Sequence, residues 1–325
     1  MLQHLFFLLA PCARIFAGPT NYVTAANSIP VSVREADLYG VNGLDIVVAN
    51  SGTDNVGVLL NNGDGTFAPE VTYSTGTGSK PMSVFLADVD GDADPDVVVT
   101  NSGTDNVGVL LNNGDGTFAP QQTFSTGAGS KPMSVFVTDV NAAGNPDIVV
   151  ANSGTDNVGV LLSNGAGTFG AQTLYPTGAG SKPMSVFVTN VNNGNDPDIV
   201  VANSGTDNVG VLLSNGAGTF AAQVIYPTGA GSKPMSVYVV DVGGNPDPDI
   251  VVANSGTDNV GVLLNNGAGG FGAQTLYPTG AGSKPVSVYV TNVGGTPDRD
   301  IVVANSGTDN VGVLLNNAAG VFAAQ

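Results

Sequence analysis

The chain repeats itself every 51 residues, and this period constrains the fold more than any other feature of the sequence. The motif Asn-Ser-Gly-Thr-Asp-Asn occurs six times at this spacing, beginning at Asn50, Asn101, Asn152, Asn203, Asn254 and Asn305. Phenylalanine keeps the same interval, at Phe16, Phe67, Phe118, Phe169, Phe220, Phe271 and Phe322. A fixed period of this length is typical of solenoids, propellers and other arrays. The sequence therefore predicts one body built from six similar units.

Each unit carries four short strand patterns separated by Gly, Asn and Asp turns. In the third unit they cover residues 134–138, 147–152, 158–162 and 172–175. The second pattern is apolar on both faces, as expected for a strand that is covered from both sides. Four strands per unit predict an all-β fold, a six-bladed β-propeller of four-stranded blades with 51-residue repeats.

The two ends of the repeat array predict how the ring closes. The last unit ends at Gln325, before a fourth strand of its own, and residues 19–24 align with that missing strand. We therefore expect an N-terminal strand to close the last blade, because this pairing would remove an exposed sheet edge.

Residues 16–325 are predicted to form a single propeller domain, and residues 1–15 allow two interpretations. Their apolar stretch, residues 5–10, is too short to span a bilayer and is typical of a secretory signal peptide. The 51-residue frame also aligns residues 5–9 with residues 56–60, so that the leader would be the degenerate end of an earlier repeat. Both interpretations stay open.

The stretch 88–96 concentrates negative charge at alternating positions. Its carboxylates are Asp88, Asp90, Asp92, Asp94 and Asp96. Crowding like charges is unfavourable without a cation, and Ca²⁺ prefers oxygen ligands at such spacing. An EF-hand is excluded because Gly91 is fourth in the stretch and Val99 twelfth, where that loop needs Gly sixth and Glu twelfth. The sequence predicts a Ca²⁺ loop within a β-hairpin.

The equivalent loops of the other units retain fewer oxygen ligands. Two of them are predicted to bind Ca²⁺ more weakly, through Asp139, Asn141 and Asp147, and through Asp241, Asn245 and Asp249. The loops that open at Asp37, Asn190 and Asn292 have non-ligands at ligand positions, and little specific binding is expected there. The alternative for all these degenerate loops is a plain hairpin turn rich in Asp and Asn.

Three motifs at fixed spacing resemble a known repeat family. They are Asp88-x-Asp90-Gly91-Asp92-x-x-x-Asp96, Asn101-Ser102-Gly103 and Asn113-Gly114-Asp115-Gly116-Thr117-Phe118. Over residues 16–325 the chain resembles the FG-GAP/VCBS repeats of integrin α-subunit propellers, secreted bacterial repeat proteins and a fungal propeller lectin. The resemblance implies that the loop between the first two strands of a blade binds Ca²⁺, here through the side chains of Asp88, Asp90, Asp92 and Asp96 and the backbone carbonyl of Asp94. It implies adhesion, lectin or enzyme-accessory roles alike.

Charge and composition exclude several classes of function. The net charge of −18 argues against nucleic-acid binding, which needs a basic surface. Cys12 is the only cysteine and His4 the only histidine, so the repeats lack the residues for Ser-His, Cys-His and His-ligated zinc sites. No enzyme and no membrane span are predicted.

We expect a non-enzymatic extracellular β-propeller, secreted or at the cell surface, that serves adhesion or binds a ligand such as a glycan, with structural Ca²⁺. The alternative is a structural protein that assembles into extracellular filaments or surface arrays, because nearly identical blades offer repeated equivalent contacts. Tyr175, Tyr226 and Tyr277 are expected to pack at strand edges, with stacking on sugars as the alternative. The recurring lysines are expected to be solvated, with anion binding as the alternative: Lys80, Lys131, Lys182, Lys233 and Lys284.

Overall fold

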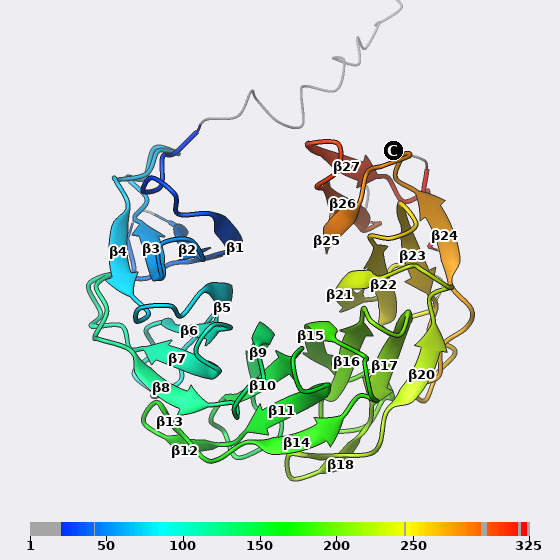
Figure 1. Ribbon diagram of the computed structural model, residues 1–325, viewed down its shortest axis with the longest axis horizontal. Coiled ribbons are helices and arrows are strands. Elements are labelled where there is room, and N and C mark those ends of the chain that lie inside the picture. The colour runs from blue at the N-terminus through cyan, green and yellow to red at the C-terminus, as the bar shows by residue number, and fades with distance from the viewer. Residues whose placement is uncertain (1–20, 42, 244, 294–297, 318–319, 324–325) are drawn as a thin grey trace, which may run out of the picture.

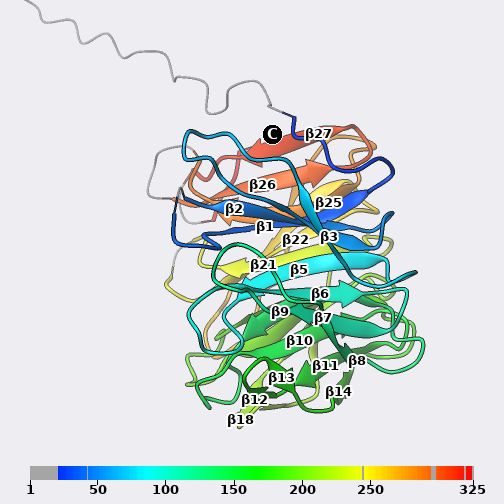
Figure 2. The ribbon, with the colours of Figure 1, turned by 90° about the vertical axis from the view of Figure 1, so that its left-hand side faces the viewer.

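The computed structural model describes residues 21–325 except 42, 244, 294–297, 318–319 and 324–325. Six antiparallel sheets form an arc around a central axis, and the first strand of each sheet lies nearest the axis (Figure 1). We number the sheets blades 1 to 6 in chain order. Turned by 90°, blades 1, 2 and 3 lie as successive layers (Figure 2). The described part of the chain contains strands and no helix, so the predicted all-β, six-bladed propeller is confirmed.

The strands recur at equivalent positions of every blade. The first strands are β1 (Pro30–Ala36), β5 (Pro81–Ala87), β9 (Pro132–Thr138), β15 (Pro183–Thr189), β21 (Pro234–Val240) and β25 (Pro285–Thr291). The second strands are β2 (Asp45–Asn50), β6 (Asp96–Asn101), β10 (Asp147–Asn152), β16 (Asp198–Asn203), β22 (Asp249–Asn254) and β26 (Asp300–Asn305). The third strands are β3 (Asn55–Leu59), β7 (Asn106–Leu110), β11 (Asn157–Leu161), β17 (Asn208–Leu212), β23 (Asn259–Leu263) and β27 (Asn310–Leu314).

Outer strands complete five of the six sheets. They are β4 (Val71–Ser74), β8 (Gln122–Ser125), β14 (Thr173–Pro176), β20 (Val224–Pro227) and β24 (Thr275–Pro278). Short hairpins precede two of them, formed by β12 (Ser163–Gly165) with β13 (Thr168–Phe169) and by β18 (Ser214–Gly216) with β19 (Thr219–Phe220). The four strand patterns of the third unit are therefore observed with small shifts at their ends.

The apolar core lies between consecutive blades. Side chains of β10 alternate in direction: Val149 and Ala151 pack against blade 4, whereas Ile148 and Val150 pack against blade 2. These four side chains are fully buried, which explains why the second strand of a unit lacks a polar face. Five apolar clusters of this kind join the six blades in sequence.

The Asn-Ser-Gly-Thr-Asp-Asn motif joins neighbouring blades as well as strands. Asp105, in the turn between β6 and β7, accepts the backbone N–H groups of Gly129 (2.7 Å) and Lys131 (2.9 Å) from the loop that leads to blade 3. The corresponding turn of blade 3 holds the same loop, since Gly154 donates its N–H to the Ser130 carbonyl at 2.8 Å. The motif Asp therefore has a structural role, and its partners are 24 and 26 residues away rather than in its own turn.

The expected closure of the ring is not observed, and this part of the fold prediction is corrected. Blade 6 has three strands, β25-β26-β27, and residues 21–24 form no strand. This segment contacts blade 1 instead: the Tyr22 ring packs edge-on against Phe67 with centroids 5.3 Å apart, and the Ala25 N–H donates to Glu70 at 3.1 Å. An outer strand normally pairs with the third strand of its own blade, as β4 does with β3, and also makes an aromatic contact with the following blade, as Tyr73 does with Phe118 at 5.3 Å. Residues 21–24 make the second kind of contact without the first. An opening therefore separates blade 1 from blade 6 (Figure 1).

Both interpretations of residues 1–15 fall outside the described residues, as do the first two residues of the expected closing strand. Within the described part of the chain, no helix is long and apolar enough to cross a membrane.

Candidate functional site

The Asp-rich loop connects β5 to β6, as expected, and brings three of its five carboxylates together. One oxygen from each of Asp88, Asp90 and Asp96 lies within 4.8 Å of the others. Asp92 and Asp94 do not join this group: Asp92 accepts the Asp94 N–H at 2.9 Å within the loop. Among the described residues, this is the one cluster of three such side chains close enough for a shared ion.

Asp96 has a structural role that was not predicted from the sequence. It is fully buried, and its two oxygens accept the N–H groups of Val89 and Asn112, both at 2.8 Å. The last Asp of each loop makes the same pair of bonds in every blade, including the blades with degenerate loops; these residues are Asp45, Asp96, Asp147, Asp198, Asp249 and Asp300. The signal was present in the sequence, because this Asp recurs without exception while the other loop positions vary.

Burial changes the proton affinity of the cluster. It raises the pKa of Asp96 to about 6, and the charges of Asp90 and Asp92 add to the effect, while the two backbone hydrogen bonds oppose it. Burial also raises the pKa of Asp90, with contributions from Asp92 and Asp88. A divalent cation among these oxygens would relieve the repulsion, so the donor set fits a hard cation such as Ca²⁺. Three close carboxylates are nevertheless fewer than the five ligands that the sequence predicted.

The weaker loops use their polar groups mostly for internal hydrogen bonds. Asp139 accepts the N–H groups of Ala143 (3.2 Å) and Gly144 (2.7 Å), and Asn141 also accepts from Ala143, at 2.8 Å. In the 241–249 loop the Asn245 side chain donates to the Asn265 carbonyl at 3.0 Å. These contacts are those of hairpin turns rich in Asp and Asn. Neither loop forms a three-carboxylate cluster among the described residues.

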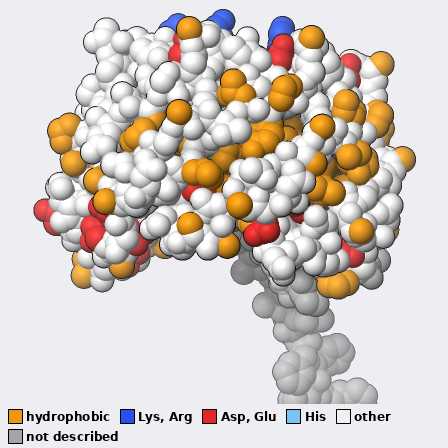
Figure 3. Space-filling model, turned by 90° about the horizontal axis from the view of Figure 1, so that it is seen from below, with side chains coloured by type: hydrophobic (Ala, Val, Ile, Leu, Met, Phe, Trp, Pro, Cys, Tyr) orange, Lys and Arg blue, Asp and Glu red, His pale blue; other side chains and the backbone are white. Residues whose placement is uncertain are grey.

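The tyrosines and lysines have structural roles. The Tyr175, Tyr226 and Tyr277 rings pack edge-on against phenylalanines of the next blade, and their hydroxyls donate to backbone carbonyls at 3.0 to 3.4 Å. Edge packing is therefore observed. Lysine and arginine side chains appear along one edge of the propeller in Figure 3. The backbone N–H groups of the recurring lysines donate hydrogen bonds to the motif Asp residues.

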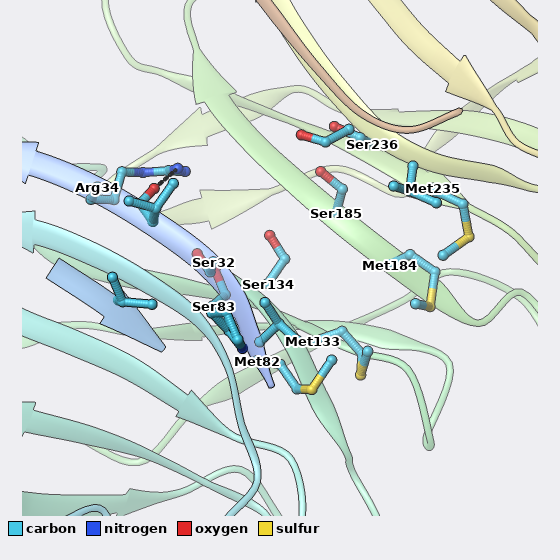
Figure 4. A pocket seen from close by; sticks show the side chains of 16 residues that line it. Ser32, Arg34, Met82, Ser83, Met133, Ser134, Met184, Ser185, Met235 and Ser236 are labelled. Carbon is cyan, nitrogen blue, oxygen red and sulfur yellow. Dashed lines mark hydrogen bonds between the residues drawn. The ribbon is translucent and has the colours of Figure 1, made fainter. Parts of the chain in front are cut away.

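The central channel contains a second candidate site that the sequence reasoning missed. A cavity of about 460 Å³ is lined by the first strands of all six blades. Serines occupy one position of every blade in its wall, methionines occupy the preceding position in four blades, and Arg34 also lines it (Figure 4). The signal was a break in the period: Arg34 stands where the later units have Phe85, Phe136, Phe187, Tyr238 and Tyr289.

A groove of about 410 Å³ lies on the outer surface between blades 2 and 3. It is lined by Thr123, Phe124 and Ser125 of β8 and by residues 169–172 of the next blade. Thr123 and Ser125 are exposed and offer hydroxyl groups to the groove, whereas the Phe124 ring packs edge-on against Phe169 with centroids 5.2 Å apart. Apolar side chains gather across the middle of the outer face shown in Figure 3.

The fold and the sites define a class of protein: a β-propeller with an acidic loop between the first two strands of a blade. The FG-GAP-like repeat model matches the chain at residues 37–99, 88–150, 139–201 and 190–252. The chain belongs to the FG-GAP-like repeat family, which confirms the resemblance inferred from its motifs. No curated protein sequence matches the chain.

Solved structures with the same fold have diverse functions. A lectin from Agrocybe aegerita that specifically recognises non-reducing terminal N-acetylglucosamine is 27% identical, with a TM-score of 0.65, over 90% of this chain and 78% of that chain. A virginiamycin B lyase from Staphylococcus aureus is 14% identical, with a TM-score of 0.67, over 93% of this chain and 86% of that chain. A putative 6-phosphogluconolactonase from Bacteroides uniformis is 15% identical, with a TM-score of 0.67, over 93% and 85%. The last two likenesses show the fold alone.

Proposed function

We propose that this chain is a non-enzymatic glycan-binding β-propeller that acts outside the cell and uses Ca²⁺ in the 88–96 loop as a structural ion. The observation that carries the proposal is the 27% identity with a lectin over 90% of the chain. The outer groove between blades 2 and 3 supports it, because the exposed Thr123 and Ser125 of β8 offer hydroxyl groups there. Polar groups placed in such a groove can bind the hydroxyls of a sugar.

A structural role for Ca²⁺ is supported by the position of the loop. Asp88, Asp90 and Asp96 lie in a hairpin connection, and Asp96 already fixes two backbone amides of blade 2. These side chains would hold the ion, which would neutralise their charge and fix the loop. The repeats hold no histidine or cysteine to provide a base or nucleophile beside it.

The test is binding of purified, Ca²⁺-loaded protein to a glycan array, followed by calorimetric titration with N-acetylglucosamine and, as a matched control, galactose. We expect retention on glycans with terminal N-acetylglucosamine and an affinity for that sugar at least about tenfold above that for galactose. Absence of binding to every glycan on the array would contradict the proposal. A steady release of sugar product would contradict its non-enzymatic part.

Self-assembly is a second candidate, favoured by the uncovered faces of blades 1 and 6. Val311 of β27 is 67% exposed and Val33 of β1 is 55% exposed, whereas the equivalent Val209 and Val135 are buried between blades. The uncovered face of blade 6 is therefore apolar like the faces that pack against a following blade. The uncovered face of blade 1 is apolar like the faces that pack against a preceding blade. A contact between blade 6 of one copy and blade 1 of the next would be head-to-tail and would extend into chains.

The double variant Val33→Asp and Val311→Asp tests assembly, because charge on both faces opposes their contact. Multi-angle light scattering and electron microscopy should show polymers for the native chain and monomers for the variant, whereas Val71→Asp, which charges an exposed outer strand, should leave assembly unchanged. A monodisperse native monomer at all concentrations would exclude this candidate.

A further inference from the structure

The only arginine of a first strand points into the channel cavity without a carboxylate partner. Arg34 lies on β1, lines the cavity, and donates one hydrogen bond, from Nη1 to the neighbouring Val33 carbonyl at 3.0 Å. Its guanidinium stands over the Phe85 ring, 5.9 Å from the centroid. Among the described residues no Asp or Glu oxygen is within salt-bridge distance of it. A guanidinium carries five N–H donors, so most of its hydrogen-bonding capacity is available to a ligand.

Arg34 is the only charged side chain among the residues that line the channel cavity. The net charge of the chain is −18, and the positive charges of Arg34 and Arg299 both lower the pKa of Tyr238 on β21, which lies outside the residues that line the cavity. Loss of water lowers the pKa of the Arg34 guanidinium, while Glu35, Tyr238 and Tyr289 raise it. The Glu35 carboxylate acts from a distance and forms no ion pair with Arg34. The Arg34 guanidinium is exposed in the channel and has few polar partners, so it can bind an anion that enters the cavity.

The serines of the first strands add hydroxyl donors around the same space. Ser134, Ser185 and Ser236 each accept a backbone N–H from the next blade at 3.2 to 3.3 Å, from Val186, Val237 and Val288. Each hydroxyl thus accepts one hydrogen bond from the protein and keeps its own proton to donate. In Figure 4 these hydroxyls and the Arg34 guanidinium border one space.

Apolar groups complete the cavity wall. Met82, Met133, Met184 and Met235 line it, with Val31 and Val286 at the equivalent positions of blades 1 and 6. Methionine side chains adapt to apolar ligands of different shape. A cavity of about 460 Å³ is within the size range of sites for small molecules.

We propose that the central channel binds a small amphiphilic carboxylate, with its carboxylate on Arg34 and the serine hydroxyls and its apolar body along the methionines. This site is distinct from the outer groove and does not depend on glycan binding. No chemical step is involved, because Arg34 and the serines only donate hydrogen bonds to the carboxylate.

Calorimetric titration of the full chain with 4-phenylbutyrate tests the proposal, with 4-phenylbutan-1-ol as the matched neutral probe. We expect the carboxylate to bind at least about tenfold more tightly than the alcohol. Arg34→Phe restores the aromatic residue of the other units and should lose this preference. Lys182→Ala removes a cation from a loop between blades and should keep it.

Equal binding of the two probes, no heat with 4-phenylbutyrate up to about 10 mM, or an unchanged preference in Arg34→Phe would each overturn the proposal. If Arg34→Phe does not fold, as judged by circular dichroism, Arg34→Gln provides the same comparison with a polar side chain of similar length. Ser185→Ala should weaken carboxylate binding severalfold with no effect on the alcohol.

Discussion

Two Asp positions of the repeat, the motif Asp and the last Asp of the metal-type loop, have different structural roles. The motif Asp residues are exposed or half-buried and accept amides of the loops between blades, whereas the last Asp of each metal-type loop is buried in its own blade. Their pKa values shift in opposite directions, because hydrogen bonds dominate at Asp54 and burial dominates at Asp96. The two groups should therefore respond to pH with opposite sign.

Acidification should remove the contribution of the motif Asp residues. The backbone N–H of Lys80 holds the pKa of Asp54 below its ordinary value of 3.8, and Lys284 and Gly282 do the same for Asp258. A carboxyl group whose pKa is lower in the folded state stabilises the fold above pH 3.8, the ordinary pKa. This stabilisation is lost as the pH falls through the pKa of the folded state. Melting temperatures measured from about pH 5 to pH 2 should fall less steeply for Asp54→Asn with Asp258→Asn than for the native chain. A parallel fall would contradict the assignment.

Ca²⁺ affinity should depend on Asp88 and Asp90 more than on Asp92. We expect Asp88→Asn with Asp90→Asn to reduce the affinity measured by calorimetry at least about tenfold, because each removes a charged ligand from the close cluster. Asp92→Asn is the matched control from the same loop and should have a smaller effect. Equal losses from both variants would instead support the full ligand set predicted from the sequence.

Protons should compete with Ca²⁺ at Asp96. Its folded-state pKa of about 6 is raised above the ordinary 3.8, so in chelator its contribution to stability is present below 3.8 and lost as the pH rises through about 6. Ca²⁺ favours the charged carboxylate, and its affinity should therefore rise as the pH increases through about 6. Titrations at pH 5 and pH 7.5 check this expectation; an affinity that is the same at both would show that Asp96 is not coupled to the ion.

Among the elements, the turn between the second and third strands depends on close backbone contact. A Cβ built on Gly154 would lie 2.0 Å from the Gly129 carbonyl oxygen, which belongs to the loop from blade 2. Backbone atoms cannot yield as a flexible side chain can, so the junction between the blades must shift. The identical sequence of this turn in all six blades is thus explained by packing between blades.

Gly154→Ala should lower the free energy of unfolding by about 1–3 kcal/mol. Gly170→Ala is the matched control, because its Cβ would meet only the Leu162 carbonyl oxygen at 3.6 Å and blade 4 has Ala221 at the same position. Urea unfolding of both variants measures the difference. If the two variants are equally stable, the contact at Gly154 does not hold the junction.

For the whole molecule, stability should come mainly from the five apolar clusters between blades. Ca²⁺ bound only to the folded loop adds roughly 2.7 kcal/mol when free Ca²⁺ is about 100 times the dissociation constant. Chelator should therefore lower the melting temperature while the far-ultraviolet circular dichroism spectrum at 25 °C stays unchanged, and added Ca²⁺ should restore it. Unfolding in chelator at 25 °C would show that the ion is required for folding.

The sequence alone determined the number of blades, their four-strand pattern and the position of the acidic loop, because periodicity and turn residues are local properties. Tertiary structure decided what depends on contacts between distant units. Asp96 is a structural residue because its burial brings it to the Asn112 amide, and Arg34 lines a channel because six first strands meet around one axis. The ends of the array were also decided by tertiary contacts: Tyr22 packs on Phe67 of blade 1, but residues 21–24 form no ladder with β27 of blade 6.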